Sequence, residues 1–127
     1  MAKVEKIGRL RPVVGAHYGT LEFIAQRMTA IVMAVYTVIL MVGYLTMSGF
    51  SYAGWKSLFT FKLLMLPMGQ MLATAAMLSL AWHVWIGIRD IWMDYVKSAG
   101  VRLALYVLTL AWILGSVFYF LHILWRN

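Results

Sequence analysis

The clearest feature of the chain is three long stretches that contain no Asp, Glu, Lys or Arg. They cover residues 28–55, 63–88 and 103–125. Each stretch is longer than the roughly 20 residues that an α-helix needs to cross the hydrocarbon core of a bilayer. No water reaches the backbone in that core, so a spanning segment must satisfy its own N–H and C=O groups as a helix. The pattern predicts an all-α membrane protein with three transmembrane helices, at about residues 27–49, 60–92 and 102–125.

The connections between these helices are marked by small and polar residues. Residues 48–54 contain two serines and two glycines, a composition typical of turns. The link at residues 98–100 is short, which predicts that the second and third helices are antiparallel neighbours. Pro67 is expected in the first turn of the second helix or at a kink within it. Residues 1–127 are then a single membrane-anchor domain, with residues 1–26 as a polar N-terminal segment.

The basic residues are distributed unevenly around the stretches, and this predicts an orientation. The N-terminal segment and the second loop together hold eight Lys and Arg residues, against three in the first loop and at the C-terminus. Cytoplasmic segments of membrane proteins carry the excess of Lys and Arg. We therefore expect the N-terminus inside the cell and the C-terminus outside it.

Composition and charge narrow the class of protein further. Hydrophobic residues make up 64% of the chain and charged residues 12%, whereas a soluble domain is about half apolar and a quarter charged. The formal charge of +7 would suggest nucleic acid in a soluble protein. Here the basic residues cluster outside the apolar stretches, so topology and lipid headgroups explain them and no nucleic-acid binding is expected. The absence of cysteine excludes thiolate metal sites and protein-ligated iron–sulfur clusters within this chain.

Candidate chemistry is concentrated on one face of the second predicted helix. Steps of three and four residues bring to this face Ala76, Ser79, His83, Gly87, Asp90 and Asp94. Small residues on either side of a histidine leave room for a flat ligand, and imidazole is a usual axial ligand of haem iron. An ionisable side chain within a span is a functional candidate by default. The alternative is that His83 hydrogen-bonds a neighbouring helix and that the small residues only let helices pack closely.

The other two histidines are weaker candidates. His122 is predicted about 5 Å from the outer end of the third helix, whereas His83 is roughly 30 Å from Leu63 at the outer start of the second stretch. Two histidines at such different depths cannot bind one iron atom between them. A second strong ligand would come from another chain, or the iron would be five-coordinate. His122 is expected at the membrane interface, and His17 is expected to be solvated.

Three residues near the inner membrane face are candidates for binding polar ligands. Tyr95 lies about 18 Å beyond His83 if the helix continues, and its hydroxyl can hydrogen-bond a carbonyl such as that of a quinone. The alternative is an ordinary interfacial aromatic residue. Asp94 either orients a basic partner or is solvated. Arg27 pairs with Glu22, marks the topology, or binds an anion such as a haem propionate.

Two blocks of the sequence resemble the small hydrophobic anchor subunit, or D subunit, of bacterial succinate dehydrogenase (succinate:quinone oxidoreductase, complex II). The first block is Arg-Met-Thr-Ala-Ile-Val at residues 27–32, with Ser-Gly at 48–49 closing that helix. The second and more specific block is His-Val-Trp-Ile-Gly at 83–87, continued by Asp-Tyr-Val-Lys at 94–97 and Arg-Leu at 102–103. The resemblance covers about residues 20–127.

The resemblance implies a set of cofactors and partners. His83 would be one axial ligand of a haem b shared with a companion cytochrome b subunit, which supplies the second histidine. Tyr95 would hydrogen-bond ubiquinone near the iron–sulfur subunit, Asp94 would pair with an arginine of the companion subunit, and Arg27 would lie near the haem propionates. A flavoprotein subunit would oxidise succinate. The chain itself would be a multi-pass, lipid-embedded subunit of the bacterial inner membrane that does not catalyse alone.

Two other kinds of function are compatible with the residues. One is the anchor of a different haem b quinone-linked dehydrogenase, although such anchors usually carry more histidines inside their spans. The other is a small membrane protein without a cofactor, such as a structural anchor or a transporter. Coupled transporters commonly place an acidic residue within the membrane, and none of the three charge-free stretches contains one.

Overall fold

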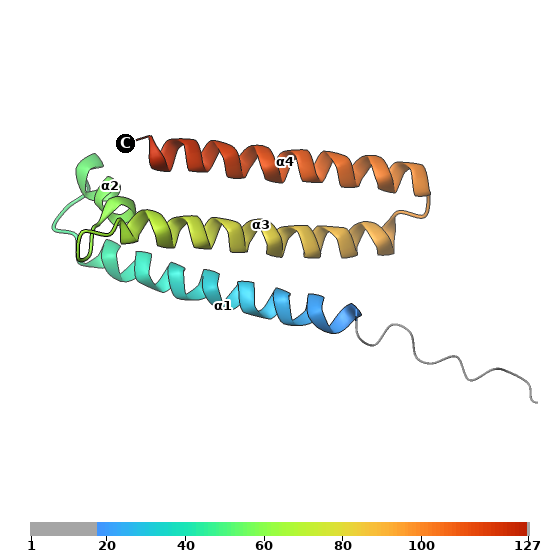
Figure 1. Ribbon diagram of the computed structural model, residues 1–127, viewed down its shortest axis with the longest axis horizontal. Coiled ribbons are helices and arrows are strands. Elements are labelled where there is room, and N and C mark those ends of the chain that lie inside the picture. The colour runs from blue at the N-terminus through green and yellow to red at the C-terminus, as the bar shows by residue number, and fades with distance from the viewer. Residues whose placement is uncertain (1–17, 127) are drawn as a thin grey trace, which may run out of the picture.

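The computed structural model describes residues 18–126, and this part of the chain is built from four α-helices (Figure 1). They are α1 (Tyr18–Leu45), α2 (Tyr52–Thr60), α3 (Met68–Tyr95) and α4 (Ala99–Trp125). Three of them, α1, α3 and α4, are long and apolar enough to cross a membrane. The prediction of an all-α chain with three membrane-length helices is therefore confirmed.

The first long helix begins nine residues before the predicted start at residue 27. The prediction placed that start at the last charged residue, Arg27, because charge is unfavourable in hydrocarbon. In the structure α1 continues back to Tyr18 and includes both Arg27 and Glu22. A helix requires only its backbone hydrogen bonds, so it extends beyond the apolar core wherever charged side chains find a partner.

The short helix α2 was not predicted and replaces part of the expected loop. Its N-cap is Ser51, whose side-chain oxygen accepts a hydrogen bond from the Gly54 N–H at 3.1 Å. Such a cap satisfies one of the free N–H groups in the first helical turn. Its nine residues extend about 14 Å, too short to span a bilayer. We conclude that α2 is a connecting helix at the end of the molecule where α1 finishes.

The second long helix starts at Met68 rather than near residue 60. Pro67 is its N-cap and so lies before the helix, not at a kink inside it. Proline lacks an N–H and disfavours the α conformation in the residue that precedes it, which explains the late start. Just before it, Leu63 and Leu66 exchange two backbone hydrogen bonds around a tight turn in which Leu64 and Met65 have positive φ values of 48° and 67°.

The three long helices lie side by side in one layer, with α3 between α1 and α4 (Figure 1). Helices α3 and α4 are antiparallel neighbours joined by a short link, as the sequence predicts. Hydrogen bonds set their register at both ends: the Trp125 indole N–H donates to Thr74 Oγ1 at 3.2 Å, and the Trp92 indole N–H donates to Thr109 Oγ1 at 3.2 Å.

One layer of helices has little interior. Among the described residues, the buried apolar side chains are Ala73, Ala76, Ile86 and Leu124. Many large apolar side chains, such as Leu108 and Trp112, remain exposed along the helices. An apolar surface of this extent needs lipid or other protein chains to cover it.

Candidate functional site

His83 lies on α3, is half-buried, and faces α1. Its Nδ1 atom is 3.2 Å from the Thr29 hydroxyl oxygen, and its Nε2 atom is 3.2 Å from the Gln26 amide nitrogen. Gln26 and Thr29 are three residues apart on α1, so they share one side of that helix. Both ring nitrogens of the candidate ligand are therefore held by α1, which agrees with the alternative that His83 hydrogen-bonds a neighbouring helix.

The space expected beside His83 is occupied by Gln26. Gly87 is one turn from His83 on α3, and a Cβ atom added there would lie 3.7 Å from the Gln26 amide nitrogen. The small residues on this face thus let a polar side chain of α1 approach α3. The side-chain amide oxygen of Gln26, Oε1, is buried and has no hydrogen-bond partner. A buried acceptor without a partner costs about 1–3 kcal/mol. The Gln26 side-chain amide is therefore only partly hydrogen-bonded in this position.

Gln26 also lines an open groove of about 490 Å³ between α1 and α3. The groove is bordered by Gly19, Glu22, Phe23, Gln26, Arg27, Ile86 and Asp90. Since Gln26 contacts Nε2 of His83 and also lines the groove, its side chain stands between the two.

Arg27 is exposed at the edge of this groove and does not pair with Glu22, which was one of its predicted roles. Its guanidinium carbon lies 4.3 Å from the centroid of the Phe23 ring, in a cation–π contact. Glu22 pairs with Arg89 instead. The guanidinium N–H groups of Arg27 are thus placed where a bound anion can reach them.

The Glu22–Arg89 pair joins α1 to α3 and was not predicted. Arg89 Nη1 donates to Glu22 Oε1 at 2.7 Å, Arg89 Nη2 donates to Glu22 Oε2, and Arg89 also lies 3.3 Å from Asp90 Oδ1. Two parallel bonds of this kind fix geometry as well as charge. The signal in the sequence is an acid and a base that each interrupt an apolar helix. Their pairing depends on the α1–α3 register, which no local pattern contains.

Asp94 and Tyr95 lie at the end of α3, and the helix continues to Tyr95 as expected. The axial distance from His83 to Tyr95 is therefore the predicted 18 Å or so. Tyr95 is 82% exposed and Asp94 is also exposed. This chain alone does not enclose a ligand at Tyr95, so a binding pocket there needs walls from other subunits.

His122 is not close to this site. His122 is exposed near the end of α4, where Trp125 contacts Thr74. Thr74 is nine residues from His83, or about 14 Å along the axis of α3. With α3 starting at Met68, His83 lies about 22 Å from the helix start rather than the 30 Å expected from Leu63. His17 lies outside the described residues.

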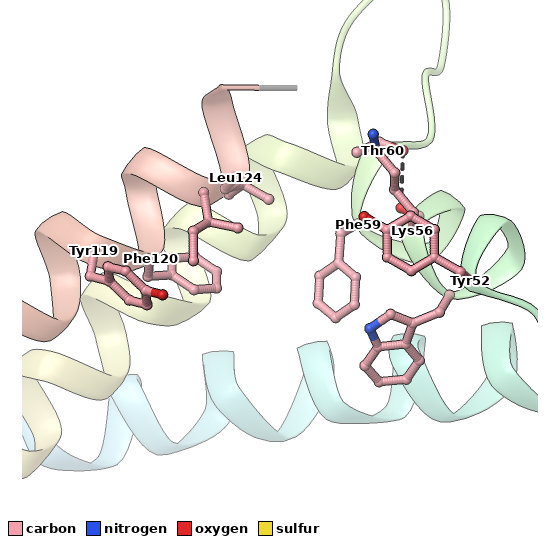
Figure 2. A pocket seen from close by; sticks show the side chains of 9 residues that line it. Tyr52, Lys56, Phe59, Thr60, Tyr119, Phe120 and Leu124 are labelled. Atoms are coloured by element: carbon pink, nitrogen blue, oxygen red, sulfur yellow. Dashed lines mark hydrogen bonds between the residues drawn. The ribbon is translucent and has the colours of Figure 1, made fainter.

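A second hollow lies at the end of the molecule where His122 is found. It has a volume of about 380 Å³ and separates α2 from the last turns of α4. Figure 2 shows Tyr119, Phe120 and Leu124 on its α4 side and Tyr52 and Phe59 on its α2 side. Its lining is mostly apolar, and it is remote from His83, so it is not part of the site around that histidine.

Three membrane-length helices in one layer, with polar contacts between them and apolar faces left uncovered, define the chain as a multi-pass membrane protein of the anchor type. It matches the family model described as succinate dehydrogenase/fumarate reductase transmembrane subunit over residues 1–123. It is also similar to the succinate dehydrogenase hydrophobic membrane anchor subunit of Coxiella burnetii, with 31% identity over 107 residues, which cover 84% of this chain and 89% of that protein. The chain therefore belongs to the succinate dehydrogenase/fumarate reductase transmembrane subunit family, as the resemblance indicated.

Membership of this family makes the chain a membrane-anchor subunit, which implies association with the other subunits of such a complex. The uncovered apolar faces of the single helix layer are in keeping with that role, because they provide surface for neighbouring chains as well as for lipid.

Proposed function

We propose that this chain anchors a succinate dehydrogenase in the bacterial inner membrane and, together with a cytochrome b subunit, binds haem b and ubiquinone. Electrons from succinate oxidation would pass through an iron–sulfur subunit to the quinone pool. The observation that carries the proposal is the place of His83: a half-buried imidazole in the middle of a membrane-length helix, one side chain away from a groove that Arg27 borders.

The residues around the groove fit a haem. His83 offers an imidazole nitrogen, the usual axial ligand. The side-chain oxygen Oε1 of Gln26 is buried without a hydrogen-bond partner, which supports a site that groups from outside this chain complete. Arg27 is an exposed cation at the groove edge, suited to a propionate. When bound, haem b would supply a one-electron carrier, and the open side of the groove would be closed by the cytochrome b subunit, which would bring the second histidine.

The proposed quinone site is at the inner end of α3. The Tyr95 hydroxyl is exposed there and free to donate to a quinone carbonyl. Asp94 would orient an arginine of the cytochrome b subunit beside it. The N-terminus would be cytoplasmic and the C-terminus periplasmic, which brings Tyr95 to the face where an iron–sulfur subunit docks. Because Tyr95 is the last residue of a rigid helix, its position relative to the rest of α3 is well defined.

The anchor of a different quinone-linked enzyme is the second candidate, since the matched family includes fumarate reductase. The similar Coxiella burnetii protein is a succinate dehydrogenase subunit, which favours succinate oxidation. A transporter is not supported. The long helices do contain acidic residues, Glu22 on α1 and Asp90 and Asp94 on α3, because they extend beyond the charge-free stretches. Glu22, however, is paired with Arg89.

The experiment that tests this function is purification through a tag on this chain in mild detergent, followed by a succinate-driven quinone reductase assay. We expect a flavoprotein, an iron–sulfur protein and a second membrane protein to co-purify with it, and succinate to reduce a soluble ubiquinone analogue. Co-purification with reduction of quinone by a different donor would favour the other dehydrogenase. Purification of the chain without any redox partner would contradict the proposal.

A further inference from the structure

The hydrogen bonds around His83 differ in a way that assigns its ring proton. The Thr29 hydroxyl oxygen lies 2.8 Å from the Ala25 carbonyl oxygen and 3.0 Å from the Gln26 carbonyl oxygen, both on its own helix. A hydroxyl has one proton to donate, and here it is used on a backbone carbonyl. The 3.2 Å contact to His83 Nδ1 must then have Thr29 as the acceptor and Nδ1–H as the donor.

A neutral imidazole carries only one ring proton, so Nε2 of His83 is left with a free lone pair. The Gln26 side-chain amide faces this atom and is a donor, which matches the assignment. Both contacts of the ring thus agree on one tautomer: proton on Nδ1, lone pair on Nε2. This is the tautomer that a metal ligand bound through Nε2 requires, with the other nitrogen fixed by an acceptor.

We propose that Thr29 is the positioning residue of the haem ligand: its hydroxyl, anchored to the α1 backbone, holds the proton of His83 on Nδ1 and turns Nε2 toward the iron. This inference rests on the proposed function. Gln26 is the complementary part of the arrangement. Its amide satisfies Nε2 while no iron is bound, and its side chain swings aside when haem occupies the groove.

The position of Gln26 supports this exchange. The Gln26 side-chain nitrogen contacts Nε2 of His83. The side-chain oxygen Oε1 is buried without a hydrogen-bond partner, and the side chain borders the groove. Moving the Gln26 side chain therefore breaks its hydrogen bond to His83 Nε2 and takes the unsatisfied oxygen Oε1 out of its buried position. Thr29, in contrast, is tied to α1 through its own backbone bond and keeps its place in either state.

Loss of the Thr29 hydroxyl should weaken the ligand in two measurable ways. An acceptor on Nδ1–H increases the basicity of the imidazole and so stabilises ferric iron. Without it the haem midpoint potential should rise. Removal of such an outer hydrogen bond typically costs about 10–100-fold in metal affinity, so haem transfer from the purified complex to apomyoglobin should be faster by about that factor.

The variants are Thr29→Val, which keeps the shape and removes the hydroxyl, and Thr29→Ser, which keeps the hydroxyl. The matched control is Thr37→Val: Thr37 is on the same helix, and its hydroxyl also bonds a carbonyl one turn back, that of Met33 at 2.8 Å. We expect a raised potential and faster haem loss in Thr29→Val alone, with Thr29→Ser and Thr37→Val close to wild type. If Thr29→Val does not assemble, Thr29→Ala takes its place beside Thr29→Ser.

The inference and the proposed function fail in different ways. A wild-type complex without haem would contradict the proposed function. The role of Thr29 alone would be overturned by a second result. In that result the haem depends on His83, but its midpoint potential and rate of loss are the same in Thr29→Val (or Thr29→Ala) as in Thr37→Val. Equal changes in the Thr29→Ser and Thr29→Val variants would also overturn it, because Thr29→Ser keeps the hydroxyl and the effect would then come from packing at this position.

Discussion

The α2 backbone packs closely against the first turn of α3 at Gly69, and this contact allows a quantitative prediction. A Cβ atom added at Gly69 would lie 2.7 Å from the Phe59 carbonyl oxygen and 2.8 Å from its carbonyl carbon. That backbone would have to withdraw by about 0.7 Å to reach the 3.4 Å of an ordinary contact. Gly69 is also hydrogen-bonded through its N–H to the Phe61 carbonyl at 3.0 Å, so a shift strains this bond as well.

Two effects of opposite sign act in Gly69→Ala. Alanine is favoured over glycine within a helix by roughly 1 kcal/mol, and less than that applies in a first turn. Overpacking against a backbone costs about 1–3 kcal/mol. Because the neighbouring atoms are backbone rather than a flexible side chain, the steric cost should win, and we expect a net loss of about 1–2 kcal/mol in the free energy of unfolding.

Gly100→Ala is the matched control, because Gly100 occupies the same second position in α4 and nothing lies within 4 Å of its added Cβ. Reversible unfolding of the purified chain in mixed detergent micelles, followed by tryptophan fluorescence, compares the two variants. We expect Gly69→Ala to be less stable than wild type and Gly100→Ala to be equal or slightly more stable. Equal stability of the two variants would refute the close approach of α2 to α3.

Other predictions concern the end of the molecule where α1 begins and α3 ends. Glu22→Gln removes the carboxylate that accepts two bonds from Arg89, so the complex should lose haem at a lower temperature; an unchanged transition would show that the pair does not join α1 to α3. Tyr95→Phe should lower kcat for quinone reduction by about a hundredfold, the low end of the effect of removing one donor to the reacting group, without altering the haem spectrum; full activity would remove Tyr95 from the site. Arg27→Gln should speed haem loss in low salt more than in high salt, because screening already weakens a propionate contact in the latter; a loss rate equal to wild type would exclude that contact.

Most of the fold was accessible from the sequence because membrane solvation is a strong local constraint. Charge-free stretches of sufficient length must be helices, and the short link at residues 98–100 sufficed to predict that α3 and α4 are antiparallel. The helix ends were less accessible. The start of α1 depends on the pairing of Glu22 with a residue of α3, and the start of α3 depends on Pro67 and the turn before it. Both helix starts depend on contacts between elements or on specific backbone conformations. The periodicity of the sequence carries no information about either.

The site was accessible only in part. His83 and Tyr95 stand out because a polar residue at helical spacing in an apolar segment is conspicuous, and both occupy the expected positions on α3. The roles of Gln26 and Thr29 were not predicted, since each is an unremarkable polar residue of α1 until the register of α1 on α3 brings it to His83. In the proposed function, the helix faces that complete a haem and quinone pocket would belong to other chains.

His83 must meet two requirements in this arrangement. Together they explain why the hydrogen bonds of both its ring nitrogens come from one helix, α1. In a bilayer every polar group must be satisfied before any cofactor arrives, and Gln26 and Thr29 do this for both ring nitrogens. A ligand must also be able to give up one of those contacts. Gln26 has the longer and more mobile side chain and the open groove beside it, so Nε2 is the nitrogen that can be exposed without disturbing the packing of α1 against α3.

The most direct test of the account is a reduced-minus-oxidised visible spectrum of the complex purified through this chain, recorded for wild type, His83→Ala and His122→Ala. His122 is the control because it is exposed near the end of α4, away from His83. The account predicts a sharp b-type α band in the wild type and in His122→Ala, lost or shifted in His83→Ala. An unchanged band in His83→Ala, or no haem in any of the three, would contradict it.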